Sequence, residues 1–362
     1  MNEKALIAMS GGVDSSVAAY LMIKAGYECQ GATMKLYSPG DEYASEQSCL
    51  TSSDIEDARN IALRLGMPYD VYNFSDRFKE EVMDKFVYCY EHGITPNPCV
   101  DCNRYLKFEY LFDKAHELGC DFVVTGHYAA IEYDEKSGRY LLKKSDNLAK
   151  DQSYFLYSLS QEQLSKAKFP LGQMDKGLVR QIAEEQNFIN ANKSDSQDIC
   201  FVTNGKYSDF IEKYTGKTYE AGDFVDIDGN VLGRHSGIIR YTIGQRKGLG
   251  VSFSEPLYVV KVDVEKNQVV LGKNEDLFSR ELIADDFNWI SIEDIDAPLR
   301  VKARVRYRHT EQWANVEKLS DGRIRIVFDE PQRAITKGQS VVLYDEDVVV
   351  GGGTIVDVAE SK

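Results

Sequence analysis

A glycine-rich turn near the start of the chain constrains its fold more than any other feature: residues 8–16 read Ala-Met-Ser-Gly-Gly-Val-Asp-Ser-Ser. The apolar run Ala5–Met9 before it predicts a buried strand, and the apolar face of Ser15–Ala25 after it predicts a helix. At such a junction the first N–H groups of the helix lack partners, and the helix dipole adds positive charge. Because Gly11 and Gly12 let the backbone close around an anion, the turn predicts a phosphate site.

The serines of this turn favour a ligand over the alternative, a glycine-rich loop that binds nothing. Ser10, Ser15 and Ser16 would add hydroxyl donors to the backbone N–H groups. The kinase-type phosphate loop needs a Lys-Ser/Thr pair after its last glycine, which this turn lacks. The pattern Ser-Gly-Gly-x-Asp-Ser instead resembles the PP-loop of the ATP pyrophosphatases, which cleave ATP between its α and β phosphates. That resemblance implies a loop that holds the pyrophosphate, with Asp14 helping to place magnesium.

Strand and helix signals alternate over residues 1–205, which predicts an α/β domain with a parallel sheet and helices on both faces. Ligands of such sheets lie beyond the carboxyl ends of the strands, here after Met9, at Thr33–Lys35 and at Thr125–Tyr128. The predicted strands are Ala5–Met9, Cys29–Met34, Tyr69–Asn73 and Asp121–Thr125, and the predicted helices are Ser15–Ala25, Asp54–Leu65, Asp76–His92, Tyr105–Leu118 and Lys176–Gln186.

The second half of the chain has the pattern of short strands separated by turns. Asp228-Gly229 is a hairpin signal, and so is Ser320-Asp321-Gly322. We therefore expect three domains: an α/β domain over residues 1–205, a small central β domain over 206–275, and a C-terminal β-barrel over 276–362.

The composition limits where the protein works and what it binds. The chain has no apolar run of membrane-spanning length and no signal peptide, so we expect a cytoplasmic protein without a membrane partner. Seven cysteines, an odd number, fit reduced thiols better than a disulfide scaffold. The net charge of −15 argues against nonspecific nucleic-acid binding but leaves room for a local basic site.

Two stretches carry cysteines in functional surroundings. Thr95–Asn103 has two prolines and two asparagines, which predict an extended loop entering a helix near Asn103. Cys102 would then lie at a helix N-terminus, where the dipole favours the thiolate. Cys200 ends the polar stretch that begins at Lys193. The pair Cys99-x-x-Cys102 is open to three interpretations: half a zinc site, although the chain has no second Cys-x-x-Cys or His-x₃-His pair; a thioredoxin-like redox pair; or a pairing of Cys102 with Cys200 across the nucleotide site.

Six motifs in order make the resemblance specific. They are the PP-loop, the Asn97–Asn103 loop, Thr125–Ala129, Lys150–Leu156, Asp195–Phe201 and Tyr241–Gly248. Together they resemble the tRNA-specific 2-thiouridylases over nearly the whole chain. The resemblance implies that ATP adenylates the 2-carbonyl oxygen of the tRNA wobble uridine. A persulfide on Cys200, charged by a cysteine desulfurase or a sulfur relay, would then deliver sulfur, and AMP would leave. Cys102 would release the sulfur by forming a disulfide with Cys200.

The same resemblance assigns the site residues and a monomeric state. The catalytic residues would be Cys102 and Cys200. The ATP site would comprise Ala8, Met9, Ser10, Gly11, Gly12, Val13, Asp14, Ser15, Met34 and Gly126. The tRNA contacts would be Asn97, Pro98, Cys99, Lys150, Asp151, Gln152, Arg306 and Tyr307. Many members of the family have an aspartate where this chain has Cys99, which puts an acid–base role there in doubt and adds a second thiol about one helical turn from Cys102. Asp101 is a candidate substitute for that aspartate. Cys29, Cys49, Cys89 and Cys120 are interpreted as structural.

A row of cations would hold the RNA. In a strand, the side chains of residues 300, 302, 304, 306 and 308, all Arg or Lys, share one face. That face suits phosphates, and Tyr307 could stack on a base. His127 is equally compatible with a general base and with a structural role. Two rival functions are an amidating PP-loop ligase, which would need an ammonia source, and a tRNA-binding module with a vestigial nucleotide site.

Overall fold

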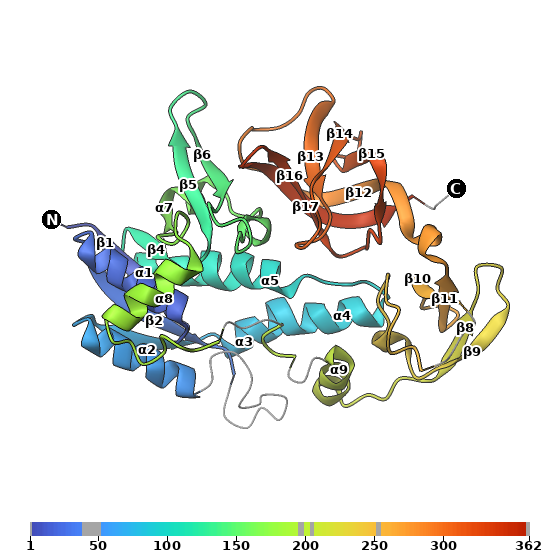
Figure 1. Ribbon diagram of the computed structural model, residues 1–362, viewed down its shortest axis with the longest axis horizontal. Coiled ribbons are helices and arrows are strands. Elements are labelled where there is room, and N and C mark those ends of the chain that lie inside the picture. The colour runs from blue at the N-terminus through green and yellow to red at the C-terminus, as the bar shows by residue number, and fades with distance from the viewer. Residues whose placement is uncertain (1, 38–51, 195–198, 203–205, 251–254, 360–362) are drawn as a thin grey trace.

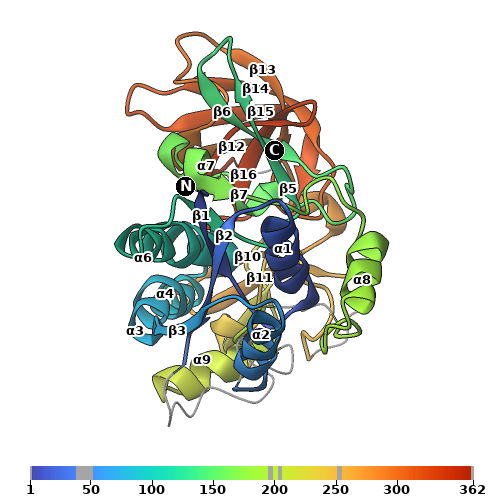
Figure 2. The same ribbon diagram turned by 90° about the vertical axis from the view of Figure 1, so that its left-hand side faces the viewer.

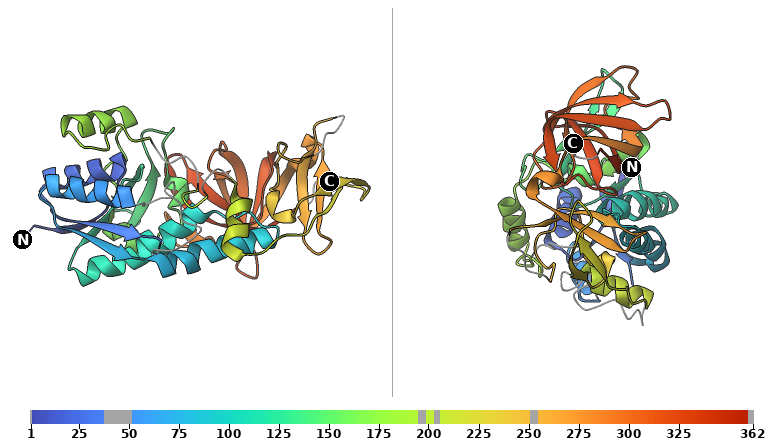
Figure 3. Two further views of the ribbon diagram at one scale, coloured as in Figure 1. Left: turned by 90° about the horizontal axis from the view of Figure 1, so that it is seen from below. Right: turned by 90° about the vertical axis from the view of Figure 1, so that its right-hand side faces the viewer.

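The protein is described from a computed structural model, which covers residues 2–37, 52–194, 199–202, 206–250 and 255–359 (Figure 1). Over these residues the strands form a five-stranded, a four-stranded and an eight-stranded sheet. The five-stranded and four-stranded sheets lie towards opposite ends of the molecule's long axis (Figures 1 and 3). In this part of the chain, no helix combines the length and the apolar character that crossing a membrane requires.

The predicted parallel sheet is confirmed, with strand order β3-β2-β1-β4-β7. Its strands are β1 (Lys4–Ala8), β2 (Glu28–Lys35), β3 (Tyr69–Asn73), β4 (Phe122–Val124) and β7 (Ala167–Lys168). One face is covered by α1 (Val13–Lys24), α2 (Ser52–Arg64) and α8 (Lys176–Glu185), and the other by the helices around α3, α4 and α6 (Figure 2). Because helices cover both faces of the sheet, its strands β1 and β4 are short, nearly continuous apolar runs.

Two continuous helical runs cover the second face. The first comprises α3 (Ser75–Phe78), η1 (Lys79–Asp84) and α4 (Lys85–Glu91); the second comprises α5 (Pro98–Asp101), η2 (Cys102–Tyr110) and α6 (Leu111–Glu117). Both η1 and η2 are π-helical. The prediction that this helix begins near Asn103 was wrong, because it begins at Pro98. Proline needs no N–H at the first helical position, and the Asn97 carbonyl accepts the N–H groups of Val100 and Asp101.

A hairpin that the sequence analysis missed, β5 (Ala129–Asp134) and β6 (Arg139–Lys144), leaves the α/β region and joins the eight-stranded sheet. After the hairpin, the chain continues through η3 (Ser153–Phe155) and α7 (Gln161–Lys166). A single buried cluster includes Phe108, Leu142 and Tyr154 from the α/β region together with Val342 and Tyr344 from the C-terminal region. The apolar core is therefore continuous between the first and last parts of the chain.

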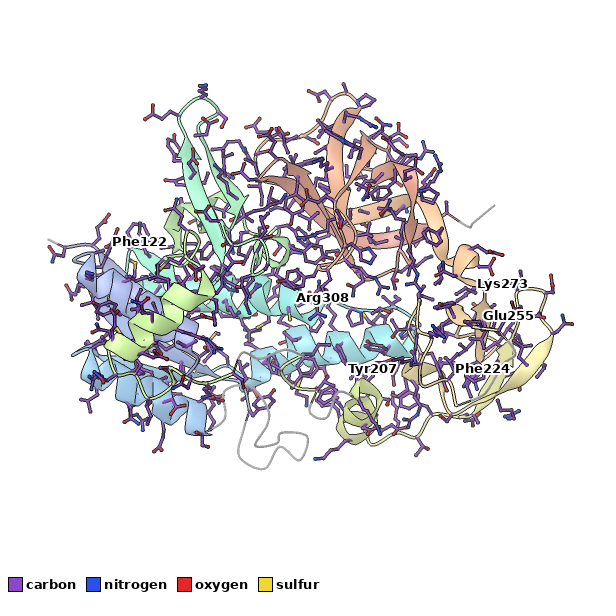
Figure 4. The ribbon with its side chains drawn as sticks, in the orientation of Figure 1. Phe122, Tyr207, Phe224, Glu255, Lys273 and Arg308 are labelled. Carbon is purple, nitrogen blue, oxygen red and sulfur yellow. The ribbon has the colours of Figure 1, made fainter. Side chains whose placement is uncertain are left out.

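The predicted small central β domain is confirmed as a four-stranded sheet, and it is preceded by a helix that the sequence analysis did not predict. Its elements are α9 (Tyr207–Thr215), β8 (Gly222–Val225), β9 (Val231–His235), η5 (Ile238–Arg240), β10 (Tyr258–Asp263) and β11 (Gln268–Gly272). Phe224 is fully buried in its core. Tyr207 of α9 stacks on Tyr90 of α4 with 4.4 Å between ring centroids, which ties this region to the α/β region (Figure 4).

The predicted C-terminal barrel is confirmed. After η6 (Asn274–Leu277), its strands are β12 (Phe278–Trp289), β13 (Leu299–Arg304), β14 (Gln312–Lys318), β15 (Ile324–Arg333), β16 (Ser340–Asp345) and β17 (Val348–Val358). Pairing of β12 with both β15 and β17 closes the ring. Closure of the barrel gives the backbone N–H and C=O groups of every strand a neighbouring strand to bond. Along each strand, residues that point into the barrel alternate with residues that point outward.

The expected basic strand face is wrong in its extent. β13 ends at Arg304, whose Nε donates to the carbonyl of His309 across the turn that follows. Arg306 therefore does not continue the outward row. Its guanidinium is buried and donates to Thr336 Oγ1 at 2.6 Å and to the Ile243 carbonyl at 3.3 Å. Arg300, still on the strand, forms a two-pronged ion pair with Asp329.

Gly338 holds the barrel against the loop that leads to α5, and its replacement tests that joint. Gly338 has φ +87°, and a Cβ there would overlap Ile94 and lie 2.8 Å from the Thr95 carbonyl oxygen. Gly338→Ala should lower the free energy of unfolding by at least about 3 kcal/mol, measured by chemical denaturation. Gly229, at φ +88° with no atom within 4 Å of its Cβ position, is the matched control. Gly229→Ala should cost only the backbone penalty of about 1–2 kcal/mol. Equal losses would contradict the proposed contact.

Candidate functional site

The glycine turn lies at the carboxyl end of β1, where α1 begins at Val13. Gly11 has φ +72°, and a Cβ on it would overlap the Asp54 carbonyl of α2. A Cβ on Gly126, after β4, would lie 2.8 Å from the Asp14 carbonyl carbon and 2.9 Å from the Ser15 nitrogen. The turn is therefore enclosed by backbone on two sides, and both contacts require glycine.

The hydroxyls of Ser15 and Ser16 bond the turn itself, which corrects the expectation that these two residues add outward donors, whereas Ser10 is exposed. The hydroxyls of Ser15 and Ser16 donate to the Gly12 carbonyl at 3.0 and 3.1 Å, and both residues are buried. The Ser15 hydroxyl also accepts the Ser10 N–H at 3.1 Å. The N–H groups at the start of α1 have no carbonyl inside the helix to bond, which makes them suitable donors for an anion.

Asp14 is held by two residues from distant parts of the chain. The Lys176 ammonium lies 2.8 Å from each carboxylate oxygen, and the Tyr128 hydroxyl donates to Oδ1 at 2.8 Å. Lys176 is the first residue of α8, and Tyr128 follows β4. Tyr128 belongs to the strand end Thr125–Tyr128 that the sequence analysis identified, whereas no local pattern marks Lys176 as part of the site.

The carbonyl of Gly11 is fixed in a similar way from the segment after α8. Asn190 Nδ2 donates to it at 2.9 Å and to the Ser16 hydroxyl at 2.9 Å, and Lys193 Nζ lies 3.3 Å from it. Lys193 also pairs with Asp54 at 2.6 Å and with Asp57 at 2.7 Å. These side chains, which the sequence analysis did not identify, fasten the turn to α2 and to the segment that leads towards Cys200.

The two cysteines of the Asn-Pro loop occupy different surroundings. Cys99 is exposed in the first turn of the helix that begins at Pro98. Cys102 is half-buried one turn later, and its N–H bonds the carbonyls of Pro98 and Cys99. The expectation that Cys102 lies at the helix N-terminus is therefore wrong, since the helix starts earlier. The barrel supports the loop through Gln339, whose Nε2 donates to the carbonyls of Thr95 and Pro96 at 3.1 and 2.9 Å.

Cys102 and Cys200 border the same apolar cluster, on the side of the sheet that carries α3, α4 and α6. Met34 belongs to this cluster, and Ala8, which immediately precedes the turn, packs against it. Both thiols are half-buried. Residues 195–198 of the Cys200 motif lie outside the described residues.

The described cysteines that were interpreted as structural have thiols of raised pKa. Burial raises the pKa of the Cys29 and Cys89 thiols to about 11 in each case, and it also raises the pKa of Cys120. A raised pKa disfavours the thiolate, which is the reactive form. Cys49 lies outside the described residues.

Asp101 is poorly placed to replace the family's missing aspartate. Its carboxylate is buried and accepts from Lys85 Nζ at 2.7 Å. Burial raises the pKa of the carboxyl group, although the ammonium of Lys85 acts in the opposite direction. Arg104, three residues after Asp101, forms a two-pronged ion pair with Asp286 of β12. These ion pairs fix the helix on both sides of Cys102.

His127 belongs to a buried polar network. Its Nδ1 lies 2.6 Å from Thr125 Oγ1 and its Nε2 lies 3.5 Å from Lys107 Nζ. Burial lowers its pKa well below the ordinary value, and the Lys107 charge acts in the same direction. The imidazole is therefore neutral at neutral pH. Lys107 Nζ in turn donates to the side-chain oxygen of Asn103 at 2.9 Å, and Asn103 is the residue that follows Cys102.

Three further residues that were predicted to contact RNA, Asp151, Gln152 and Tyr307, have side chains that contact other parts of the protein. Asp151 is buried, and its carboxylate accepts the N–H groups of Ser145 and Ser153, each at 3.1 Å. The Gln152 side chain accepts the Tyr128 N–H at 3.0 Å. Tyr307 packs on Phe155 with 4.5 Å between ring centroids.

Tyr307 has three basic residues near it, Lys150, Arg304 and Arg308. Burial raises the pKa of Tyr307, and the charges of these three residues act in the opposite direction. Arg308 lies at the side of the barrel that faces the α/β region (Figure 4). Within the described residues, no group of three or more His, Cys, Asp or Glu side chains is arranged to hold a metal ion.

Comparison with known families divides the chain into three matches. Residues 3–204 match the family described as the tRNA methyl transferase HUP domain, residues 208–273 its PRC-barrel domain, and residues 279–355 the aminomethyltransferase beta-barrel domain. Three named relatives are similar over 98% of this chain. The tRNA-specific 2-thiouridylase MnmA of Clostridioides difficile (strain 630) is 52% identical over 98% of its own length. Those of Acetivibrio thermocellus and Lachnoclostridium phytofermentans are 50% and 48% identical, each over 99% of its own length.

These relatives carry one enzyme name, and each aligns with this chain from end to end. The match includes the parallel sheet with its glycine turn, the central sheet and the barrel. The chain therefore belongs to the family of tRNA-specific 2-thiouridylases, which are sulfurtransferase enzymes.

Proposed function

We propose that this protein uses ATP to replace the 2-oxygen of the tRNA wobble uridine with sulfur. The observation that carries the proposal is the placement of Cys102 and Cys200 around one cluster that also includes Met34 and contacts Ala8, at the edge of the glycine turn. The phosphate site lies at the carboxyl end of the sheet, and both thiols border the cluster that Ala8 contacts there. Activation by a nucleotide and sulfur transfer require these parts. We also propose the domain division 1–205, 206–275 and 276–362.

The nucleotide would lie across the carboxyl end of the sheet. Residues 8–15 would hold the phosphates through the N–H groups at the start of α1, and Met34 and Gly126 would border the rest of the nucleotide. The half-exposed carboxylate of Asp14 is an oxygen ligand of the type that magnesium accepts beside substrate phosphates. Bound there, magnesium would neutralise charge on the phosphates. The chain itself supplies the backbone donors that orient them.

Activation solves the chemical difficulty of the reaction, since the oxygen of an amide-like carbonyl is a poor leaving group. The 2-oxygen of uridine attacks the α-phosphate of ATP, an O–P bond forms, and pyrophosphate leaves. The oxygen is then expelled as AMP rather than as oxide. Donors fixed at the turn require no reorganisation during this step, which is the basis of electrostatic catalysis.

Sulfur transfer would follow on the thiol side. The terminal sulfur of a Cys200 persulfide attacks C2, after which the Cys102 thiolate attacks the Cys200 sulfur. The persulfide S–S bond breaks, its electron pair stays on the transferred sulfur, and the C=S bond forms as AMP leaves. A Cys102–Cys200 disulfide remains, which an external thiol reductant must reduce. A cysteine desulfurase or a relay protein would recharge Cys200.

Transfer RNA would contact the loops that connect the α/β region to the barrel. Asn97, Pro98 and Cys99 would approach the target base, and Lys150 would meet a phosphate. Asp151 and Gln152, whose side chains are engaged by Ser145, Ser153 and Tyr128, would act by positioning Lys150. Arg306 and Tyr307 would complete this surface. We propose that one monomer binds one tRNA.

One assay separates this function from its two rivals. The protein is incubated with ATP, magnesium, tRNA and a persulfide donor, and both AMP and thiolated uridine are quantified. Thiolation yields both products. An amidating ligase yields AMP without thiouridine, and a tRNA-binding module with a vestigial nucleotide site yields neither while still binding tRNA.

Replacing Cys200 tests the persulfide assignment. Cys200→Ser should abolish thiouridine formation, because a hydroxyl cannot carry the sulfane sulfur, and should leave tRNA affinity unchanged. Cys120 is the matched control, since it is also half-buried and borders the same cluster. Cys120→Ser should retain activity. Full activity of Cys200→Ser would remove Cys200 from the mechanism.

Replacing Lys150 tests the RNA surface. Lys150→Ala should weaken tRNA binding and reduce the slope of log affinity against log salt by about one, as the loss of one phosphate contact requires. Lys136, exposed in the β5–β6 turn, is the control, and its alanine variant should bind as the wild type does. An unchanged slope for Lys150→Ala would exclude the contact.

Arg306 should respond differently from Lys150, because its guanidinium is buried between the barrel and the central region. Arg306→Ala should weaken tRNA binding, flatten its salt dependence, and also lower the free energy of unfolding by about 2–5 kcal/mol. Binding titrations at several salt concentrations and chemical denaturation measure the two effects. Unchanged affinity with reduced stability would make Arg306 a purely structural residue.

A further inference from the structure

Lys176 stands where a cation would be needed in the proposed nucleotide site. Its ammonium is 2.8 Å from both carboxylate oxygens of Asp14, and its side chain is only 13% exposed. The pair is consequently screened far less by solvent and salt than a surface ion pair. The Tyr128 hydroxyl donates to Oδ1 of the same carboxylate at 2.8 Å, and the Lys176 ammonium lies 5.9 Å from the centroid of the Tyr128 ring.

The other lysine at this turn is differently engaged. Lys193 contacts the Gly11 carbonyl, and its charge is offset by the carboxylates of Asp54 and Asp57. Lys176 has its ion pair with the carboxylate that would face the phosphates and magnesium. Without a cation at Asp14, that carboxylate would repel a polyphosphate.

We propose that Lys176 is a phosphate-positioning residue that occupies the cation position at Asp14 until magnesium takes it. In the absence of magnesium, the ammonium neutralises Asp14 and lets the polyphosphate approach. With magnesium at the Asp14 carboxylate, the flexible four-carbon stem of Lys176 would let its ammonium turn to the phosphates. This proposal rests on the proposed nucleotide site and adds to it a residue that no sequence motif indicates.

The test measures nucleotide binding rather than turnover. Binding of α,β-methylene-ATP, which cannot be cleaved between its α and β phosphates, is measured by calorimetry with excess magnesium and again with EDTA. Lys176→Gln should lose about tenfold or more in affinity in EDTA and less than about threefold with magnesium. Lys176→Arg, which keeps the charge, should retain wild-type affinity in EDTA.

The control is Lys193→Gln, which loosens the turn without removing the charge at Asp14. It should lower affinity by the same factor with and without magnesium, because its role is to hold the backbone. Thermal melting establishes that each variant is folded. Lys176→Met, which keeps an apolar stem of similar length, repeats the measurement if the glutamine variant does not fold.

Equal losses for Lys176→Gln in the two conditions, or no loss in EDTA, would overturn the assignment of Lys176 and leave the proposed function intact. Failure of the wild-type protein to bind the analogue with magnesium present would overturn the nucleotide site itself, and the role of Lys176 with it. The two failures are therefore distinguished by the wild-type titration.

Discussion

The geometry of one short turn determines where every other part of the site has to lie. The backbone at Gly11 approaches the Asp54 carbonyl so closely that no side chain fits, and Gly126 approaches the backbone of Asp14 and Ser15 in the same way. Asn190 and Lys193 then hold the Gly11 carbonyl from a segment 179 to 182 residues further along the chain. The hydroxyls of Ser15 and Ser16 are bonded to the Gly12 carbonyl, and the N–H groups at the start of α1 have no carbonyl inside the helix to bond.

The barrel contributes to the site although its own strands carry none of the predicted nucleotide ligands. Gln339 bonds the carbonyls of Thr95 and Pro96, and Asp286 pairs with Arg104, two residues beyond Cys102. The segment that bears Cys99 and Cys102 is therefore clamped before and after its cysteines. A cysteine held between two fixed points needs little reorganisation to meet a reacting partner, and preorganisation of this kind is a main source of rate enhancement.

The sequence predicted the features whose signals are local. Short apolar runs identified the strands of the parallel sheet, and the glycines identified the turn. It could not predict Lys176 or Asn190, because a single lysine or asparagine beside a helix has no pattern and acquires its role from a partner distant in sequence. The basic row failed for a related reason: Val305 and Tyr307 continue the alternation after the strand has ended at Arg304. The start of the helix at Pro98 was missed because two prolines suggested an extended loop, whereas the second proline begins the helix.

The cluster that joins Phe108, Leu142 and Tyr154 to Val342 and Tyr344 has a consequence for how the protein unfolds. The boundaries predicted from the sequence place these residues in the first and last domains, but the residues of both domains bury their apolar surface against one another. A fragment cut between them would expose both halves of that surface to water, and removal of the β5–β6 hairpin would also bare part of the edge of β17. The α/β region and the barrel should therefore melt together as one cooperative unit, and neither is suited to separate expression.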